Sequence, residues 1–192
     1  MASAAQPLIS PAEYLEAEGK AHFRSEYFRG RMYAMAGGTR NHAVIIMNLG
    51  ASLHQRLADT DCTVTSSNWS ICVGETQFYG YPDLIVACGE PRYLQGRSDI
   101  LLNPKVIVEV LSPSTEAYDR GFKAQQYRTI ASLQEYALVS QDEARVEMYR
   151  RTPDNLWVLS EWVGMNAECR FASLDRLIPL SAVYQKVTFD ES

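Results

Sequence analysis

Hydrophobic and polar positions follow one another along this chain in short blocks that predict helices and strands. Ser10-Pro11 with acids directly after it is typical of a helix start, and this helix should end near Gly19. In residues 22–36 the apolar pairs Tyr27-Phe28 and Met32-Tyr33 flank Arg29-Gly30, which predicts a hairpin with its turn at that dipeptide. The N-terminal part of the chain is therefore expected to be a helix followed by a hairpin.

A second, longer helix is predicted to begin after Thr39 as its cap and to run to about Leu57. A third is predicted for about 119–130, and a short amphipathic piece for 182–184. The remaining apolar runs are too short for helices and predict strands. In chain order these runs are 62–65, 69–73, 82–88, 105–111, 135–139, 145–151 and 156–162, the last two forming a hairpin around Pro153-Asp154-Asn155.

The order of these elements is helix, hairpin, helix, several strands, helix and further strands. Such an order predicts an α/β fold with a mixed central sheet flanked by helices. Neither an internal repeat nor a linker-like stretch interrupts it, and 192 residues suffice for one domain with a sizeable core. We therefore expect a single domain over 1–192.

The charge of the chain is informative about a partner only in particular segments. The formal charge of the whole chain is −5, so it has no overall basic signature for nucleic acid. Residues 20–60 nevertheless have a local balance of +4, whereas residues 61–119 have a balance of −5. A nucleic-acid partner would have to bind a local basic patch, and ordinary solvated surface is an equally good interpretation of these charges.

The four cysteines lack the spacing of a zinc site. They are Cys62, Cys72, Cys88 and Cys169. Because they lie in or beside apolar runs, we expect buried thiols in a reducing compartment. The N-terminus lacks the pattern of a secretion signal, and no segment approaches the roughly 18 apolar residues of a membrane span. The sequence therefore predicts a cytoplasmic protein without a membrane partner.

Two carboxylates stand where a carboxylate is costly. Asp83 follows Pro82 and opens an apolar run, and Glu109 lies inside the run 106–111, which reads as a buried strand. A lone ionised carboxylate in such a strand costs several kcal/mol unless it is paired or binds a metal. Two neighbouring strands with one carboxylate each at the same end would form a site of hard oxygen ligands suited to Mg²⁺. A buried salt bridge is the alternative, and we favour the metal.

An ordered series of motifs around these carboxylates resembles a known bacterial family. The motifs are Tyr81-Pro82-Asp83-Leu84, Val108-Glu109-Val110-Leu111-Ser112-Pro113-Ser114-Thr115 and Tyr118-Asp119-Arg120-Gly121-Phe122-Lys123, with Tyr127. Residues 25–37 look like the N-terminal hairpin of that family, and 133–136 look like the entry to its later strand. The family comprises restriction-endonuclease-like proteins of the PD-(D/E)XK nuclease superfamily. The resemblance covers a motif core of about 22–151.

This resemblance implies a restriction-endonuclease-like fold and metal-dependent hydrolysis of DNA phosphodiester bonds. The superfamily pattern has a lysine two residues after the second acid, where this chain has Leu111. The resemblance implies that Lys123 has replaced it from the following helix. Asp119 and Lys123 are spaced to share one helix face. Lys105 is the alternative, but it lies about 13 Å along the strand from Glu109.

The chemistry assigns a role to each of these residue types. Asp83 and Glu109 are expected to bind one or two Mg²⁺ ions, with Mn²⁺ as a substitute. Lys123 is expected to orient the attacking hydroxide or to stabilise the added negative charge. Glu26 is either a further ligand or positioning group, or only a partner for a nearby arginine. His42 is a weaker candidate near a helix start, where a capping or surface role is common.

A DNA substrate would be held through phosphate contacts, and binding should weaken steeply with salt. The candidate contacts are Arg24, Arg29, Arg31, Arg40 and Arg120. Cutting both strands favours a homodimer about a two-fold axis. Two alternatives stay open: a nuclease-like fold without catalysis that serves as a DNA-binding or protein-interaction module, and a hydrolase of small phosphoesters. The sequence contains no nucleophile elbow and no phosphate-binding glycine loop.

Overall fold

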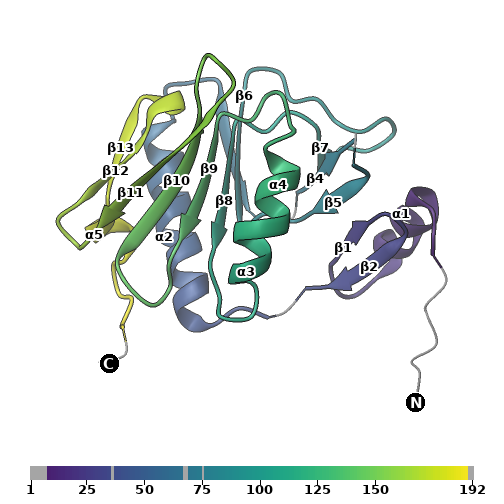
Figure 1. Ribbon diagram of the computed structural model, residues 1–192, viewed down its shortest axis with the longest axis horizontal. Helices are drawn as coiled ribbons and strands as arrows, with labels where there is room; N and C mark the ends of the chain where they lie inside the picture. The colour runs from purple at the N-terminus through teal and green to yellow at the C-terminus, as the bar shows by residue number, and fades with distance from the viewer. Residues whose placement is uncertain (1–7, 36, 67–68, 75, 190–192) are drawn as a thin grey trace.

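A computed structural model describes residues 8–35, 37–66, 69–74 and 76–189 of the chain (Figure 1). The helices are α1 (Pro11–Lys20), α2 (Arg40–Arg56), α3 (Glu116–Tyr118), α4 (Ala124–Tyr127) and α5 (Leu180–Val183), with a π-helical turn η1 (Asp119–Lys123) and a 3₁₀ turn η2 (Ala172–Leu174). The strands are β1 (Ser25–Phe28), β2 (Arg31–Ala34), β3 (Cys62–Ser66), β4 (Ser70–Val73), β5 (Phe78–Gly80), β6 (Leu84–Cys88), β7 (Ile100–Leu101), β8 (Val106–Val110), β9 (Glu135–Val139), β10 (Arg145–Arg151), β11 (Trp157–Val163), β12 (Glu168–Phe171) and β13 (Arg176–Pro179).

The strands form a six-stranded sheet, a five-stranded sheet and a small third sheet. The six-stranded sheet has the order β11-β10-β9-β8-β6-β3, and the five-stranded sheet has the order β2-β1-β5-β4-β7. Only β8–β9 and β4–β7 pair in parallel among the described strands. The third sheet pairs β12 with β13. The predicted mixed sheet is confirmed, and it is accompanied by a second sheet that carries the N-terminal hairpin.

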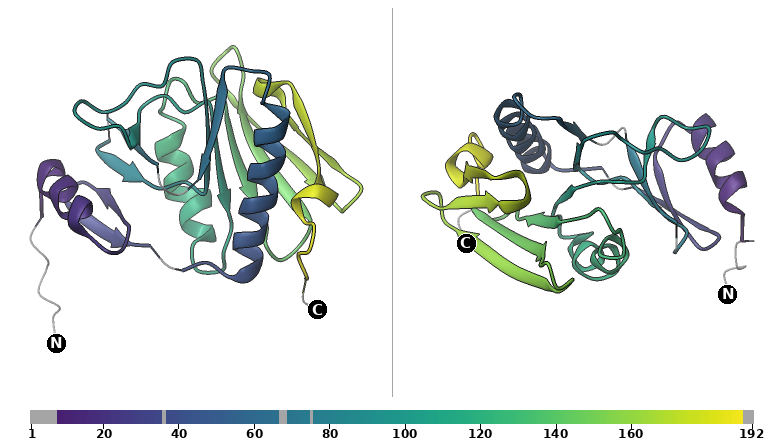
Figure 2. Two further views of the ribbon diagram at one scale, coloured as in Figure 1. Left: turned by 180° about the vertical axis from the view of Figure 1, so that it is seen from behind. Right: turned by 90° about the horizontal axis from the view of Figure 1, so that it is seen from above.

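Helices cover both faces of the six-stranded sheet (Figures 1 and 2). Helix α2 covers one face because Ile45, Leu49 and Leu53 recur every four residues and are buried against the sheet. The continuous helical segment α3-η1-α4, residues 116–127, covers the other face with Ala124 and Tyr127. The sheet is therefore buried on both sides, which explains the continuous apolar runs in its central strands.

The alternation of side chains along β8 divides its residues between the two faces. Val106, Val108 and Val110 belong to the cluster on the α2 side, and Ile107 belongs to the cluster on the opposite side. Glu109 has the parity of Ile107 and therefore faces the segment 116–127. Strand geometry alone thus directs a carboxylate into the layer between the sheet and this helical segment.

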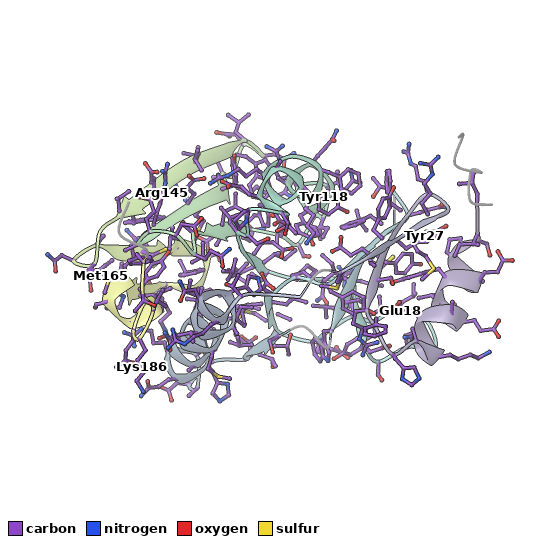
Figure 3. The ribbon with its side chains drawn as sticks, turned by 90° about the horizontal axis from the view of Figure 1, so that it is seen from below. Glu18, Tyr27, Tyr118, Arg145, Met165 and Lys186 are labelled. Carbon is purple, nitrogen blue, oxygen red and sulfur yellow. A yellow bond between two sulfur atoms is a disulfide. The ribbon has the colours of Figure 1, made fainter. Side chains whose placement is uncertain are left out.

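The N-terminal helix α1 packs on the hairpin β1-β2, which forms one side of the five-stranded sheet. A capping box between Ser10 and Glu13 begins α1, and the rings of Tyr14 and Tyr27 stack at 4.9 Å between centroids. Glu18 is buried and accepts a hydrogen bond from the Tyr81 hydroxyl at 3.1 Å. Figure 3 shows Glu18 and Tyr27 together at this end of the molecule. This packing fixes β1, the strand that carries Glu26.

Most of the predicted elements are confirmed, with differences at particular places. The predicted turn of the first hairpin lies at Arg29-Gly30, both with positive φ, of 43° and 90°. The helix predicted for 119–130 begins at Glu116, contains a π-helical turn and ends at Tyr127. Strands β5, β7, β12 and β13 were not predicted. These strands are two to four residues long, and no apolar run of the kind that predicted the other short strands marks them.

The expectation of four reduced thiols is wrong for two of the cysteines. Cys62 and Cys88 are directly paired neighbours on antiparallel β3 and β6 and form a disulfide. The sequence did not reveal this pair because the register of two strands joined by a long connection is not visible in it. Cys72 and Cys169 are free and buried, as expected. Within the described residues, no helix is both long and apolar enough to cross a membrane.

Candidate active site

Asp83 and Glu109 approach each other at one end of the six-stranded sheet. The antiparallel register of β6 and β8 pairs Leu84 with Val108, so Asp83 and Glu109 stand one step beyond that pair. Asp83 also has the parity of Ile85 and Ala87, which lie in the cluster on the side of segment 116–127. The structure brings the two carboxylates to the same end of neighbouring strands, as the sequence predicted, and also places them on one face of the sheet.

The carboxylate of Asp83 is held from two sides. Its Oδ2 accepts a hydrogen bond of 2.7 Å from the backbone N–H of Val110. The Nε2 of His42 lies 3.3 Å from the same oxygen. The hydrogen bond with Asp83 raises the pKa of His42, although burial opposes this rise. His42, a weak candidate in the sequence, thus contacts one of the two central acids.

Lys123 extends from η1 into the same region and contacts three acids. Its Nζ lies 3.1 Å from Glu109 Oε1, 3.2 Å from Glu26 Oε1 and 3.1 Å from Asp119 Oδ1. All four side chains are buried, each at most 8 % exposed. Glu26 comes from β1 of the five-stranded sheet, so the cluster joins the two sheets. Glu26 pairs with this lysine rather than with Arg29 or Arg31.

The lysine that the superfamily pattern places after the second acid is replaced here by a lysine from the helical segment. Leu111, which occupies the position of the missing lysine, is buried in the apolar cluster beside segment 116–127. Lys123 approaches Glu109 from that segment instead, as the migrated lysine requires. Lys105 is not among the described residues that line the cavity. The catalytic role of Lys123 stays a prediction.

The connection between β8 and the helical segment positions Lys123. The N–H groups of Thr115 and Glu116 both donate to the carbonyl of Ser112, which turns the chain back over the strand. Farther along, the hydroxyl of Tyr136 on β9 donates to the carbonyl of Asp119 at 3.0 Å. These hydrogen bonds fix the start of the π-helical turn, and Lys123 lies at its end, where its ammonium contacts Glu109.

Tyr127 supports Glu109 from the last turn of the helical segment. Its hydroxyl donates to Glu109 Oε1 at 3.0 Å. Gly80 makes room for this ring, because a Cβ at position 80 would lie 3.1 Å from the Tyr127 hydroxyl and 2.7 Å from Phe78. Glu109 Oε1 thus has two donors, an ammonium and a phenol.

The excess of acids determines the protonation of the cluster. Burial raises the pKa of Glu109 well above its usual value, and the negative charges of Asp83, Asp119 and Glu26 raise it further, against the effect of Lys123. Burial likewise raises the pKa of Asp119. Burial alone would lower the pKa of Lys123, but the carboxylates around it outweigh burial and hold that pKa well above its usual value. Lys123 is therefore an ammonium and not a proton acceptor.

These side chains line a cavity of about 330 Å³ between the two sheets. Asp83, Glu109, Asp119, Lys123 and Glu26 all contribute to its wall. The remainder of the wall comes from the end of β2, the start of α2, the connection before β6, and the stretch from the end of β8 to α3. These residues are Tyr33, Ala34, Met35, Gly37, Gly38, His42, Tyr81, Val110, Ser112, Ser114, Thr115 and Tyr118. Figure 3 shows Tyr118 on the helical segment, on the side toward the five-stranded sheet.

The cavity suits a divalent cation by its charge and its donor atoms. Four carboxylates face one ammonium, and that ammonium, 3.1 Å from the buried Oδ1 of Asp119, is shared with Glu26 and Glu109. Oxygen donors in excess of positive charge are what Mg²⁺ and Mn²⁺ bind. Asp83 and Glu109 are the residues that would hold such an ion. Their oxygens are at present directed to Val110 N–H and to Lys123.

A different group of residues has its potential ligand atoms closest together. Of the residues described, Asp61, Cys62 and Cys88 alone bring three such atoms within 4.8 Å of one another. This group lies at the far end of β6, and its two sulfurs form the disulfide. We therefore place the candidate metal site at Asp83 and Glu109, where charge and cavity coincide.

The predicted DNA contacts lie outside the cavity wall. Arg29 and Arg31 are exposed, and Arg40 donates to the carbonyl of Lys186. Arg120 forms ion pairs with Glu116 and Glu147. Arg24 pairs with the buried Glu18 at 3.9 Å. The structure does not test their contact with DNA, and they stay predictions.

Three residues of the cluster were missed as site residues or ranked low. Asp119 appeared in the sequence only as a helix-face neighbour of Lys123, although their i, i+4 spacing is the signal of their ion pair. His42 has no signal beyond its place near a helix start. Tyr127 belongs to the motif series, but its contact with Glu109 depends on the tertiary packing.

Comparisons with known proteins agree with this architecture. Residues 11–181 match the family described as "Uma2: Putative restriction endonuclease". The chain is similar to two uncharacterized proteins of Synechocystis sp.: it is 36% identical to one over 172 residues, covering 90% of this chain and 97% of that protein, and 35% identical to the other over 187 residues, covering 97% of each. It also resembles the crystal structure of a "putative nuclease belonging to DUF820" from Anabaena variabilis, with a TM-score of 0.77 and 16% identity over 94% of this chain and 99% of the other. This likeness confirms the predicted fold class.

Proposed function

The chain belongs to the Uma2 family of restriction-endonuclease-like proteins, and from this membership and the cavity we propose that it is a metal-dependent endonuclease that hydrolyses DNA phosphodiester bonds. The observation that carries the proposal is the juxtaposition of Asp83 and Glu109 with the Lys123 ammonium. The two acids stand at one end of adjacent antiparallel strands, and the lysine contacts Glu109 at 3.1 Å.

Each side chain of the cluster has a role in this proposal. Asp83 and Glu109 bind Mg²⁺ or Mn²⁺, which would lower the pKa of a bound water and offset negative charge on the phosphate. Lys123 remains charged and stabilises the negative charge that develops during attack. Glu26 and Asp119 hold the ammonium in place, because both contact its Nζ. Tyr127 fixes the Glu109 carboxylate through its hydroxyl.

The charge distribution suggests how DNA would approach. The net charge of −5 gives no general attraction to a polyanion. The exposed guanidinium groups of Arg29 and Arg31, on the hairpin next to Glu26, would contact phosphates near the cavity. Binding through such contacts weakens as salt rises. We further propose that the protein acts as a homodimer in the cytoplasm, where it would reach DNA. In that reducing compartment the Cys62–Cys88 pair would be held as thiols.

The first test is cleavage of supercoiled plasmid by the full chain with Mg²⁺ or Mn²⁺, and with EDTA in a parallel sample. We expect metal-dependent nicking that Asp83→Asn and Lys123→Ala each reduce by at least about 100-fold, since both remove stabilisation of the transition state. Asp99→Asn and Lys105→Ala are matched controls outside the cavity and should cleave as the wild type does. Thermal melting of every variant identifies loss of folding.

The outcomes separate the proposal from its alternatives. Nicking that survives Lys123→Ala but not Asp83→Asn would retain the metal site and refute the migrated lysine. Metal-dependent hydrolysis of a small phosphoester without plasmid cleavage would indicate the small-substrate hydrolase. Metal binding without hydrolysis of duplex DNA, single-stranded DNA, RNA or a small ester would indicate a binding module.

A further inference from the structure

His42 occupies a position in the cavity that the proposed function leaves without a role. It is the third residue of α2, and its backbone N–H donates to the side chain of Thr39, the cap of that helix, at 3.1 Å. Thr39 in turn donates to the buried side chain of Gln141 in the connection after β9, at 2.5 Å. The start of α2 is therefore fixed to the sheet, and the imidazole is carried into the wall of the cavity.

The orientation of the imidazole is set by its neighbours. A Cβ at position 38 would lie 2.7 Å from His42 Nδ1 and 3.1 Å from its Cγ, so the ring packs directly against Gly38. The opposite nitrogen, Nε2, lies 3.3 Å from Asp83 Oδ2. Only 18 % of the His42 side chain is exposed. A glycine on one side and a carboxylate on the other thus direct Nε2 toward the metal-binding acid.

The separation of these two atoms fits two ligands of one ion. Nitrogen and oxygen ligands lie about 2.1 Å from a small divalent cation, so two ligands at a right angle are about 3 Å apart. The backbone N–H of Val110 donates to the same oxygen at 2.7 Å, so Asp83 keeps a fixed hydrogen-bond donor when His42 binds the ion as a neutral imidazole. The cavity also has more carboxylates than positive charges, and a divalent cation beside Asp83 compensates more of that excess than an imidazolium would.

We propose that His42 is a nitrogen ligand, beside Asp83, of the metal ion in this cavity, and that the site therefore selects Mn²⁺ over Mg²⁺. Glu109, whose Oε1 contacts Lys123 at 3.1 Å, would turn from the lysine to share the ion. Imidazole is a ligand for first-row transition ions, whereas Mg²⁺ takes oxygen ligands almost exclusively. This inference rests on the proposed function, since it concerns the metal of that site. It adds to that function one metal ligand, His42, and the class of the bound ion, a first-row transition ion.

Metal binding tests the proposal without DNA and without turnover. Mn²⁺ is titrated into the full-length protein and followed by electron paramagnetic resonance, and pulsed measurements then detect ¹⁴N coupling from a bound imidazole. We expect wild type to show this coupling and to bind Mn²⁺ at least tenfold more tightly than Mg²⁺ in competition. His42→Gln should lose the coupling and the preference. His54→Gln, an exposed histidine of the same helix, is the matched control and should behave as wild type.

A second variant keeps the test independent of the folding of His42→Gln. Gly38→Ala retains every proposed ligand but places a methyl group where the imidazole lies. We expect Gly38→Ala to weaken Mn²⁺ binding and the ¹⁴N coupling while leaving the affinity for Mg²⁺ nearly unchanged. Unchanged Mn²⁺ binding in this variant would contradict the proposal.

The remaining outcomes distinguish failure of this inference from failure of the proposed function. Mn²⁺ binding that depends on Asp83 but lacks ¹⁴N coupling, or keeps it in His42→Gln, would refute the ligand role and leave the metal-dependent nuclease standing. If neither ion binds in a manner that Asp83→Asn abolishes, both the ligand role and the metal-dependent function are refuted.

Discussion

The residues around Lys123 combine several buried acids with one ammonium, and this imbalance affects the free energy of folding. Glu109 is the most affected, because burial first and its acidic neighbours second raise its pKa. Between the usual value of 4.5 and that raised value, the folded protein holds a proton that the unfolded chain releases. The stability contributed by this group therefore falls as the pH rises above about 4.5.

We expect Glu109→Gln to stabilise the metal-free protein at pH 7 by roughly 1 kcal/mol, as is common when a functional site is relieved of strain. Such a gain corresponds to an increase in Tm of roughly 2–4 °C for a chain of this size. The gain should be small at pH 4 and grow toward pH 7, because glutamine does not titrate. Urea unfolding in EDTA at several pH values measures it.

Two results decide this prediction. If the difference in stability between Glu109→Gln and wild type is independent of pH, the carboxylate of Glu109 does not titrate as described. Addition of Mn²⁺ should make the wild type more stable than Glu109→Gln, because only the wild type retains the full ligand set and gains stability by binding the ion. Glu143→Gln, an exposed glutamate, is the control and should change little.

At the scale of single elements, the segment 116–127 shows how an irregular helix positions its side chains. The π-helical turn Asp119–Lys123 contains Gly121, whose missing Cβ would meet no atom within 4 Å. The φ of Gly121 is not positive, so no conformational need for glycine is evident there. A π-helical turn often marks a functional site, and here it places both Asp119 and Lys123 in the cluster.

Gly121→Ala should stabilise the protein by about 0.5–1 kcal/mol, because alanine loses less conformational entropy in a helix. Plasmid nicking should be unchanged if Lys123 keeps its place. Urea unfolding and nicking of the same preparation check both expectations. Greater stability with loss of nicking would show that the turn had converted to an α-helical register and displaced Lys123.

The elements also show what the sequence could predict. Two apolar runs sufficed to predict neighbouring strands with Asp83 and Glu109 at the same end, but the shared face of the two acids follows from the register of the strands. Spacing along the helix sufficed to place Asp119 and Lys123 together. The positions of Glu26 and His42 did not follow, because they depend on how a second sheet and the start of α2 pack on the first sheet. The pairing of Cys62 with Cys88 depended on a register that no local pattern specifies.

For the whole molecule, the disulfide between Cys62 and Cys88 ties the edge strand β3 to the interior of the sheet. It closes a loop over a sequence separation of 26, for which loop-closure entropy predicts a stabilisation of about 3 kcal/mol. We expect a reducing agent, or Cys88→Ser, to lower Tm by several degrees. The control Cys72→Ser should leave the dependence on reductant unchanged. Four reactive thiols in unreduced, denatured protein would contradict the disulfide.

The predicted homodimer has a candidate surface on β11, an edge strand of the six-stranded sheet. Large apolar side chains are exposed on and beside it, namely those of Leu156, Val158, Leu159, Val163 and Met165. Edge strands with such side chains tend to pair with another chain. We expect Leu159→Lys to shift a dimer toward monomer in light scattering, with Met47→Lys, an exposed position on α2, as the control. A dimer that persists in Leu159→Lys would place the interface elsewhere.

The register of β6 and β8 also limits how this gene can change. Asp83 and Glu109 meet because two strands pair with a fixed register, while the connection after Gly89 up to Arg97 is largely exposed and contributes nothing to the cavity wall. Insertions at Gln95-Gly96 should therefore be inherited without loss of the carboxylate pair. A single residue inserted between Asp83 and Val86 would turn Asp83 toward the opposite face. Length variation among descendants of this chain should accumulate in the connection, and the strands should keep their length.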